Sequence, residues 1–162
     1  GRLTHDKALI IVGAEEDGEG IGRVRMRCIP DLTKPILHGF IDQAVDRGST
    51  IRTDGFRAYL DLNGYVHDRH IQRDQKEGEH LLPRVHRVVS LLKRWLLGTH
   101  QGSVGLLHLD YYLDEFTFRF NRRKSASRGK LFYRLIQQGV QIGPTPFAKL
   151  VKPQPVGAGG VK

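Results

Sequence analysis

Three side chains that could take part in chemistry are spaced to lie on one face of a helix. The stretch LPRVHRVVSLLKR predicts a helix over about residues 85–97, and His86, Ser90 and Lys93 fall at i, i+4 and i+7 within it. A titratable ring, a hydroxyl and an ammonium therefore share one edge, flanked by Arg87 and Arg94. The simpler alternative is that this edge is the wet side of an amphipathic helix.

A carboxylate upstream could reach the same place. In STIRTDGFRAY, Asp54 follows a short predicted strand over residues 49–53 and precedes Gly55. Sites in α/β sheets lie at strand ends near a break in strand order, which makes Asp54 a candidate. An Asp before Gly is also an ordinary turn residue and helix N-cap, so this alternative stays open.

A divalent metal is the natural link between Asp54 and His86. Carboxylate oxygens suit Mg²⁺, whereas an imidazole is better suited to Mn²⁺ or a transition metal. Two such ions about 3.5–4 Å apart can activate the attacking oxygen and stabilise the leaving oxygen in phosphodiester chemistry. Lys93 would then contact a DNA phosphate near this site. Zinc is disfavoured, because no tight ligand spacing connects His67, His70, His80 and His86.

The charge of the chain indicates a polyanionic partner. Its formal net charge is +9, and the basic residues concentrate between Arg84 and Arg134 with aromatic residues interleaved. Such a surface binds phosphates with little sequence preference and steep salt dependence, unless it is only a solvated basic face. A membrane surface is less favoured, because no apolar run approaches about 18 residues. The DNA-binding candidates are Arg87, Ser90, Lys93, Arg94, Arg122, Arg123 and Lys124.

The elements that must position these residues follow from hydrophobic periodicity. Strands are predicted over residues 7–14, 22–29 and 49–53, the first two as a hairpin, with a further short strand around 70–71. Helices are predicted over residues 33–45, 56–62, 85–97, 107–121 and 131–138. This order is typical of a mixed α/β sheet flanked by helices.

The chain length of 162 residues fits one domain. We assign residues 1–142 to that domain and residues 143–162 to a disordered tail rich in Pro and Gly. The single cysteine, Cys28, excludes an internal disulfide framework, and no signal peptide is visible, which indicates a cytosolic protein.

Several stretches together resemble a known family. KALIIVGAE, RVRMRCIPD, STIRTDGFRAY, HRVVSLLKRWLLGTHQGSV and YLDEFTFRFNRR are similar, in this order, to the transposase domain of bacterial ISXO-like insertion sequences. The similarity spans about Lys7 to Gln138, and its most specific parts are the TDGFRAY, SLLKR and YLDEFTFRFNRR segments. The family comprises DDE-type transposases with an RNase H-like fold.

The resemblance implies DNA transposition at a divalent-metal centre, which hydrolyses the strand at the element's ends and directs the freed 3′-hydroxyl at target DNA. Asp54 matches the family's second catalytic aspartate, and Lys93 matches its lysine. The third acidic position falls on His86, and members with Asn or His there belong to the family's variation. The metal would be Mg²⁺ or Mn²⁺, and transposases of this type act as multimers on paired ends, so a homo-oligomer is expected.

The chain departs from the family pattern at its beginning. The first catalytic aspartate should lie on a strand before residues 7–14, and Asp6 is too close to that strand to take its place. We therefore expect an RNase H-like sheet without its first strand, and a transposase inactive by itself. The alternatives are a non-catalytic basic DNA-binding remnant and a structural domain whose basic face is only solvated.

Overall fold

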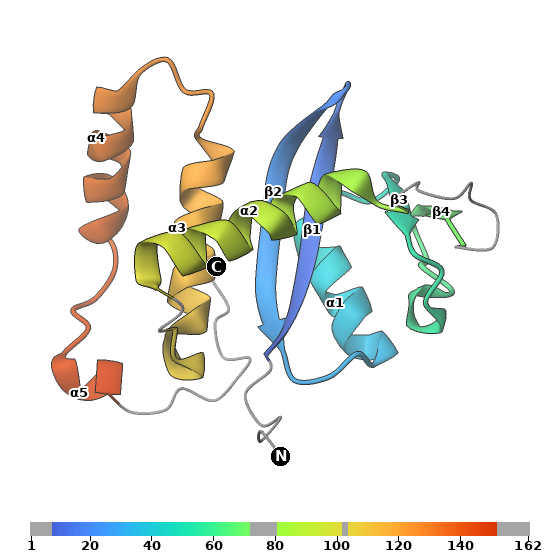
Figure 1. Cartoon of the computed structure of the whole chain (residues 1–162), viewed down its shortest axis with the longest axis horizontal. Helices are drawn as coiled ribbons and strands as arrows, with labels where there is room; N and C mark the ends of the chain where they lie inside the picture. The colour runs from blue at the N-terminus through green and yellow to red at the C-terminus, as the bar shows by residue number, and fades with distance from the viewer. Residues whose placement is uncertain (1–7, 72–80, 102–103, 152–162) are drawn as a thin grey trace.

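An antiparallel hairpin begins the part of the chain that the computed structural model describes, residues 8–71, 81–101 and 104–151 (Figure 1). β1 (Leu9–Asp17) pairs with β2 (Gly20–Ile29), and Val12 lies opposite Met26. Val24 is fully buried, whereas Arg23 and Arg25 beside it are exposed. The period of two in the sequence produces this alternation, because successive strand residues face opposite sides of the sheet. The predicted hairpin is confirmed.

A second pair of strands is parallel. β3 (Thr50–Thr53) pairs with β4 (Val66–Arg69), which lies a few residues before the predicted short strand. The helix predicted over residues 56–62 is wrong, because only the 3-10 turn η1 (Arg57–Tyr59) forms between these strands. Asp61 adopts a left-handed φ of 60°, which a right-handed helix cannot accommodate.

The strands do not join into the single mixed sheet that the sequence predicts. Among the described residues they form two separate two-stranded sheets, which follow one another in Figure 1 in the order β2, β1, β3, β4. No backbone pairing joins β1 to β3 within this part of the chain, and the Arg52 side chain on β3 instead reaches Glu16 on β1. The α/β class is confirmed, while the RNase H-like arrangement stays a prediction.

The two faces of the hairpin are covered by different helices. α1 (Lys34–Ala44) buries one cluster, made of Ile11, Ile29, Leu37, Phe40, Ile41 and Leu62. Thr33 occupies the N-cap position with an extended backbone, but its side chain makes no capping hydrogen bond. The opposite face carries α2 (Pro83–His100), which contacts β1, and α3 (Leu109–Asn121), which contacts β2.

The cluster under α2 and α3 is the larger apolar core. Its buried residues are Ile21, Val24, Val88, Leu92, Leu109, Leu113, Phe116 and Phe120. Val88 and Leu92 come from α2, and the last four come from α3. Both helices were predicted, and α3 is preceded by the 3-10 turn η3 (Leu106–His108).

Two further helices follow the core. α4 (Arg128–Gly139) confirms the predicted final helix and stands at the end of the molecule away from β3 and β4 (Figure 1). α5 (Phe147–Val151) forms within the segment 143–162 that the sequence indicated as disordered, and residues 152–162 lie outside the described part. None of the described helices is long and apolar enough to span a membrane.

Candidate functional site

The first candidate residue lies where β3 ends. Thr53 is buried and its hydroxyl is 2.8 Å from His67 Nε2 on β4, whereas the next residue, Asp54, is exposed. Asp54 Oδ1 accepts a hydrogen bond of 3.2 Å from the backbone N–H of Phe56, an Asx-type turn. Asp54 is therefore a turn residue, as the alternative in the sequence analysis held, and its carboxylate also faces solvent.

Glycine is required directly after Asp54. Gly55 adopts a φ of +80°, and a Cβ there would lie 3.2 Å from both Arg69 Nε and Ile71 Cγ1. The pKa of the nearby Tyr59 hydroxyl is raised, first by burial and then by the negative charge of Asp54. The loop therefore has a fixed conformation that presents one carboxylate at the end of the strand.

The second group of candidates lies on α2. Val88 and Leu92 turn into the core, which leaves the opposite side of the helix to solvent. As predicted, that side is polar and exposed, and it consists of His86, Arg87, Ser90, Lys93 and Arg94. These five residues form the α2 polar face. All five side chains are exposed, so this face is accessible to a polyanion.

The elements that carry Asp54 and His86 meet at Glu16, near the end of β1. Glu16 Oε1 lies 2.9 Å from an Arg52 nitrogen and 2.8 Å from an Arg84 nitrogen. Arg52 precedes Asp54 by two residues, and Arg84 precedes His86 by two. One carboxylate therefore joins the end of β3 to the first turn of α2, which in Figure 1 begins beside β3.

Arg84 and Arg52 each make further hydrogen bonds besides their contact with Glu16. Arg84 also donates to the carbonyl oxygens of Gly20 (2.9 Å) and Gly18 (2.6 Å), which fastens α2 to the hairpin turn. Arg52 donates to Asp68 on β4 across 2.9 Å, and His70 lies 3.0 Å from the same carboxylate oxygen. The hydrogen bonds from Arg52 and then His70 lower the pKa of Asp68.

Asp54 and His86 alone do not form a metal site. Within the described residues, no cluster of three or more His, Cys, Asp or Glu side chains is arranged to hold a metal ion. Mg²⁺ in proteins keeps several waters and is usually held by one or two carboxylates together with substrate phosphates, so Asp54 could supply only part of its ligands. The predicted metal centre therefore stays a prediction.

The three basic residues predicted for DNA binding after α3 have different surroundings. The Arg123 guanidinium lies 3.9 Å over the Phe120 ring and donates to the carbonyl oxygens of Phe120 (2.8 Å), Gly22 (3.3 Å) and Ile21. Lys124 pairs with Asp17 at 3.1 Å. Arg122 packs on its own helix, with its guanidinium 3.8 Å over the Phe118 ring and a hydrogen bond of 3.4 Å to the Phe118 carbonyl oxygen. Arg123 is thus committed to holding α3 against the hairpin.

Sequence reasoning missed the residues that fasten these elements together. The Asn121 side chain accepts a hydrogen bond from Val24 N–H (2.7 Å) and donates one to Val24 C=O (3.0 Å). Glu16, Arg52 and Arg84 were likewise not candidates. The only available signal for Asn121 was its place in the YLDEFTFRFNRR segment, since a partner 97 residues away leaves no spacing pattern.

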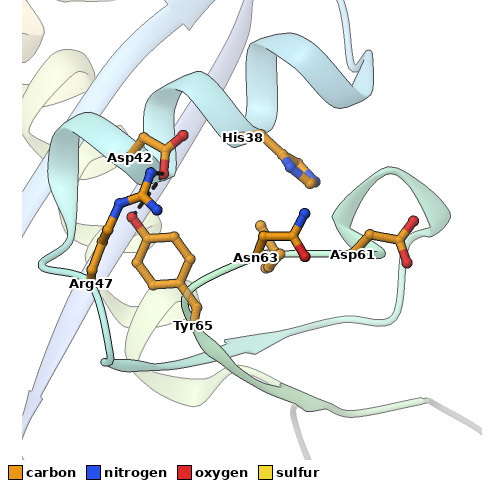
Figure 2. A pocket seen from close by; sticks show the side chains of 7 residues that line it. His38, Asp42, Arg47, Asp61, Asn63 and Tyr65 are labelled. Atoms are coloured by element: carbon orange, nitrogen blue, oxygen red, sulfur yellow. Dashed lines mark hydrogen bonds and ion pairs between the residues drawn. The ribbon is translucent and has the colours of Figure 1, made fainter.

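A polar hollow of about 170 Å³ lies elsewhere, between α1 and residues 61–65 (Figure 2). Its charged groups pair with their neighbours: Tyr65 donates to Asp42 (3.0 Å), Arg47 lies 3.6 Å from Asp42, and Asp61 lies 2.6 Å from Lys34. None of the candidate site residues lines it. The hollow is therefore separate from the predicted site.

The chain matches the model of a known family over most of its length. The model of the ISXO2-like transposase domain matches residues 1–121, about three quarters of the chain. The chain belongs to the ISXO2-like transposase family. The matched region includes the Asp54 loop, the α2 polar face, Glu16 and Asn121, and it ends with α3. No curated protein and no solved structure gave a match to this transposase domain.

Proposed function

We propose that this chain is a DNA transposase domain whose chemistry is phosphodiester hydrolysis and strand transfer at insertion-sequence ends. The observation that carries the proposal is the exposed position of Asp54 directly after β3, a strand whose Arg52 shares the Glu16 carboxylate with Arg84 at the start of α2. Membership of the ISXO2-like transposase family supports DNA as the substrate.

Within this proposal, the residues of the loop and of α2 have distinct roles. Asp54 and His86 would be metal ligands and catalytic residues, and Lys93 would neutralise a DNA phosphate next to them. Arg87, Ser90 and Arg94 would extend the contact along the backbone of the same strand, as their exposure on one helix face allows. Arg122 and Lys124 would add phosphate contacts beyond α3. Arg123 would contribute less to DNA binding, because its guanidinium already donates to backbone carbonyl oxygens.

The incomplete donor set supports the proposal that this domain does not cut DNA by itself. Mg²⁺ or Mn²⁺ would supply Lewis-acid chemistry only once further carboxylates joined Asp54 and His86. The unpaired edges of β1 and β3 could accept one more strand between them, which would complete an RNase H-like sheet. A carboxylate on that strand would lie close to the end of β3.

A second candidate function is a non-catalytic, basic DNA-binding remnant of a transposase. Two observations favour it. The described residues contain no group of three or more His, Cys, Asp or Glu side chains that could hold a metal ion, and the α2 polar face is exposed. Both candidates predict DNA binding, so only an assay of DNA cutting separates them.

The test is a nicking assay in Mg²⁺ or Mn²⁺ on DNA that carries the element's own ends. It compares this chain with a version extended by the strand that the family pattern places before residue 7, each with and without Asp54→Ala. Asp46→Ala, which removes another exposed aspartate in the connection between α1 and β3, is the matched control. We expect only the extended protein to cut, and Asp54→Ala to abolish cutting. If neither version cuts while both bind DNA, the remnant is the correct function.

A further inference from the structure

The net positive charge of this chain comes entirely from the residues that follow α3. All 17 Asp and Glu residues and 17 of the 26 Lys and Arg residues lie within residues 1–121, so the family-matched region has no net charge. Residues 122–162 contain the other nine Lys and Arg residues and no acidic residue. The net charge of +9 therefore belongs to this segment, and α4 is the longest helix described in it.

α4 adds exposed aromatic rings to this charge. Every residue of the helix from 132 to 139 is exposed, and the helix stands at the end of the molecule away from β3 and β4 (Figure 1). Phe132 and Tyr133 are 68% and 63% exposed. A helix whose rings served only the core would bury them, as α3 buries Phe116 and Phe120. The two rings of α4 are therefore available to a ligand.

Cations lie beside these rings on the helix surface. Lys130 precedes Tyr133 by three residues and Arg134 by four, so one turn of the helix brings Lys130 next to both. Both cations are exposed, and α4 contains no acidic residue that could pair with them. Arg128, the first residue of the helix, adds a third positive charge. One flank of α4 therefore offers positive charge next to an aromatic ring.

An unpaired nucleic-acid strand has the chemistry that fits this combination. Its phosphates are attracted to cations such as Lys130 and Arg134, and its free base faces stack on aromatic rings. In a duplex the neighbouring base pairs cover those faces, so a duplex could use the cations of α4 but not its rings. A lipid surface favours a helix whose cations lie opposite its rings, whereas Tyr133 shares its side of α4 with Lys130.

We propose that α4 binds an unpaired DNA strand, with Phe132 and Tyr133 stacking on bases and with Lys130 and Arg134 neutralising phosphates. The inference rests on the proposed function for its ligand, since cutting one strand of a duplex lets nucleotides at the new end unpair. The α2 polar face would hold the duplex, and α4 would hold the strand released from it. The site lies outside the family-matched residues 1–121, so the family relationship does not account for it.

Affinities for single-stranded and duplex DNA test the site in the full chain. The probes are a fluorescent oligothymidylate of about 16 nucleotides and a duplex of the same length, compared by fluorescence anisotropy. Phe132→Leu combined with Tyr133→Leu removes both rings but keeps apolar bulk and helix propensity. We expect this double variant to bind the single strand at least roughly tenfold more weakly, and the duplex within about twofold of the unmodified chain. Phe147→Leu, which removes an exposed ring from α5, is the control and should change neither affinity.

Three outcomes of this comparison would overturn the proposal. They are an unchanged single-strand affinity of the double Leu variant, an equal loss for Phe147→Leu, and an equal loss of duplex affinity. A second variant covers the case in which the Leu substitutions reduce the helical circular dichroism. Phe132→Trp combined with Tyr133→Trp keeps aromatic faces at both positions and should bind the single strand at least as tightly as the unmodified chain. A loss of about tenfold in this Trp variant would also overturn the stacking role.

Salt dependence tests the phosphate contacts separately. Lys130→Gln combined with Arg134→Gln should reduce the slope of log single-strand affinity against log salt by roughly 1.4, about 0.7 for each contact. Arg23→Gln combined with Arg25→Gln removes the same charge from β2 and should leave the slope unchanged. Equal slopes for the two double variants would overturn the phosphate role. Binding to vesicles of phosphatidylglycerol but not to oligothymidylate would overturn the proposal in favour of a lipid surface.

The nicking assay keeps this inference distinct from the proposed function. If the extended protein fails to cut while single-strand binding still depends on the two rings of α4, the proposed chemistry is wrong and the α4 site stands. If the extended protein cuts and single-strand binding does not depend on the rings, the chemistry stands and the α4 site is wrong.

Discussion

Arg52 on β3 donates to Glu16 on β1 across 2.9 Å, and this contact spans two strands that share no backbone hydrogen bond in the described structure. Because Arg84 of α2 lies 2.8 Å from the same carboxylate oxygen, Glu16 connects β1 with both β3 and α2. Arg52 and Arg84 each precede a proposed catalytic residue, Asp54 and His86, by two positions, so Glu16 connects the elements that carry the two.

Replacing Glu16 with Gln should weaken the fold modestly. The side chains of Glu16, Arg52 and Arg84 are 46%, 39% and 25% exposed, so each pair is screened and contributes about 0.2–1 kcal/mol. We expect Glu16→Gln to lower the free energy of unfolding by about 1 kcal/mol in urea titrations, and the loss to shrink at high salt. Glu19→Gln, which changes an exposed acid in the adjoining hairpin turn, is the control. Equal effects of the two variants would contradict the bridging role.

Arg123 and Arg122 should differ in their contribution to stability, although they are adjacent and both basic. Arg123→Ala removes hydrogen bonds to carbonyl oxygens of β2 and should cost about 1–2 kcal/mol, because bonds from charged donors are the stronger ones. Arg122→Ala removes only contacts within its own helix and should cost less than about 0.5 kcal/mol. Thermal and urea unfolding measure both variants. The prediction is wrong if Arg122→Ala is the more destabilising.

The α2 polar face should dominate the salt dependence of DNA binding. Lys93→Ala combined with Arg94→Ala should reduce the slope of log affinity against log salt by roughly 2, since each lost phosphate contact contributes about 0.9. Arg23→Ala combined with Arg25→Ala removes the same charge from the opposite face of the hairpin and serves as the control. Fluorescence anisotropy at several salt concentrations gives the slopes. Identical slopes for the two double variants would show that binding follows net charge alone.

The Cys28 thiol should be nearly inert in the folded protein. Burial, followed by the hydrogen bond and negative charge of Asp110, raises its pKa from 9.0 to about 12. A group whose pKa is raised by folding stabilises the fold below its unfolded pKa, and that contribution is lost as the pH rises from about 9 to 12. We expect slow reaction with a disulfide reagent at pH 8, fast reaction in urea, and falling stability above pH 9. Asp110→Asn should speed the reaction in the folded state. Rapid labelling of the folded chain at pH 8 would refute this.

The sequence by itself determined most of the elements and which of their faces are buried, whereas the helix predicted over residues 56–62 is only a 3-10 turn. Alternation along residues 22–29 placed Val24 inside and Arg23 outside, and helical spacing placed Val88 and Leu92 in the core. These features depend on neighbours within a few residues, and periodicity records such neighbours directly. The position of Asp54 directly after a strand could likewise be predicted from its immediate neighbours in the sequence. The family resemblance was also recognisable, because each of its motifs is a contiguous segment.

Only the tertiary structure decided how these elements are joined. The pairing of Asn121 with Val24 and of Arg123 with Gly22 connects residues 97 and 101 positions apart, and no periodic pattern records contacts of that range. The split into two sheets, the absence of a three-donor cluster in the described residues, and the commitment of Arg123 to carbonyl oxygens depend in the same way on long-range geometry. The sequence determined which groups are present on each element, and the packing of the elements decided which of them meet.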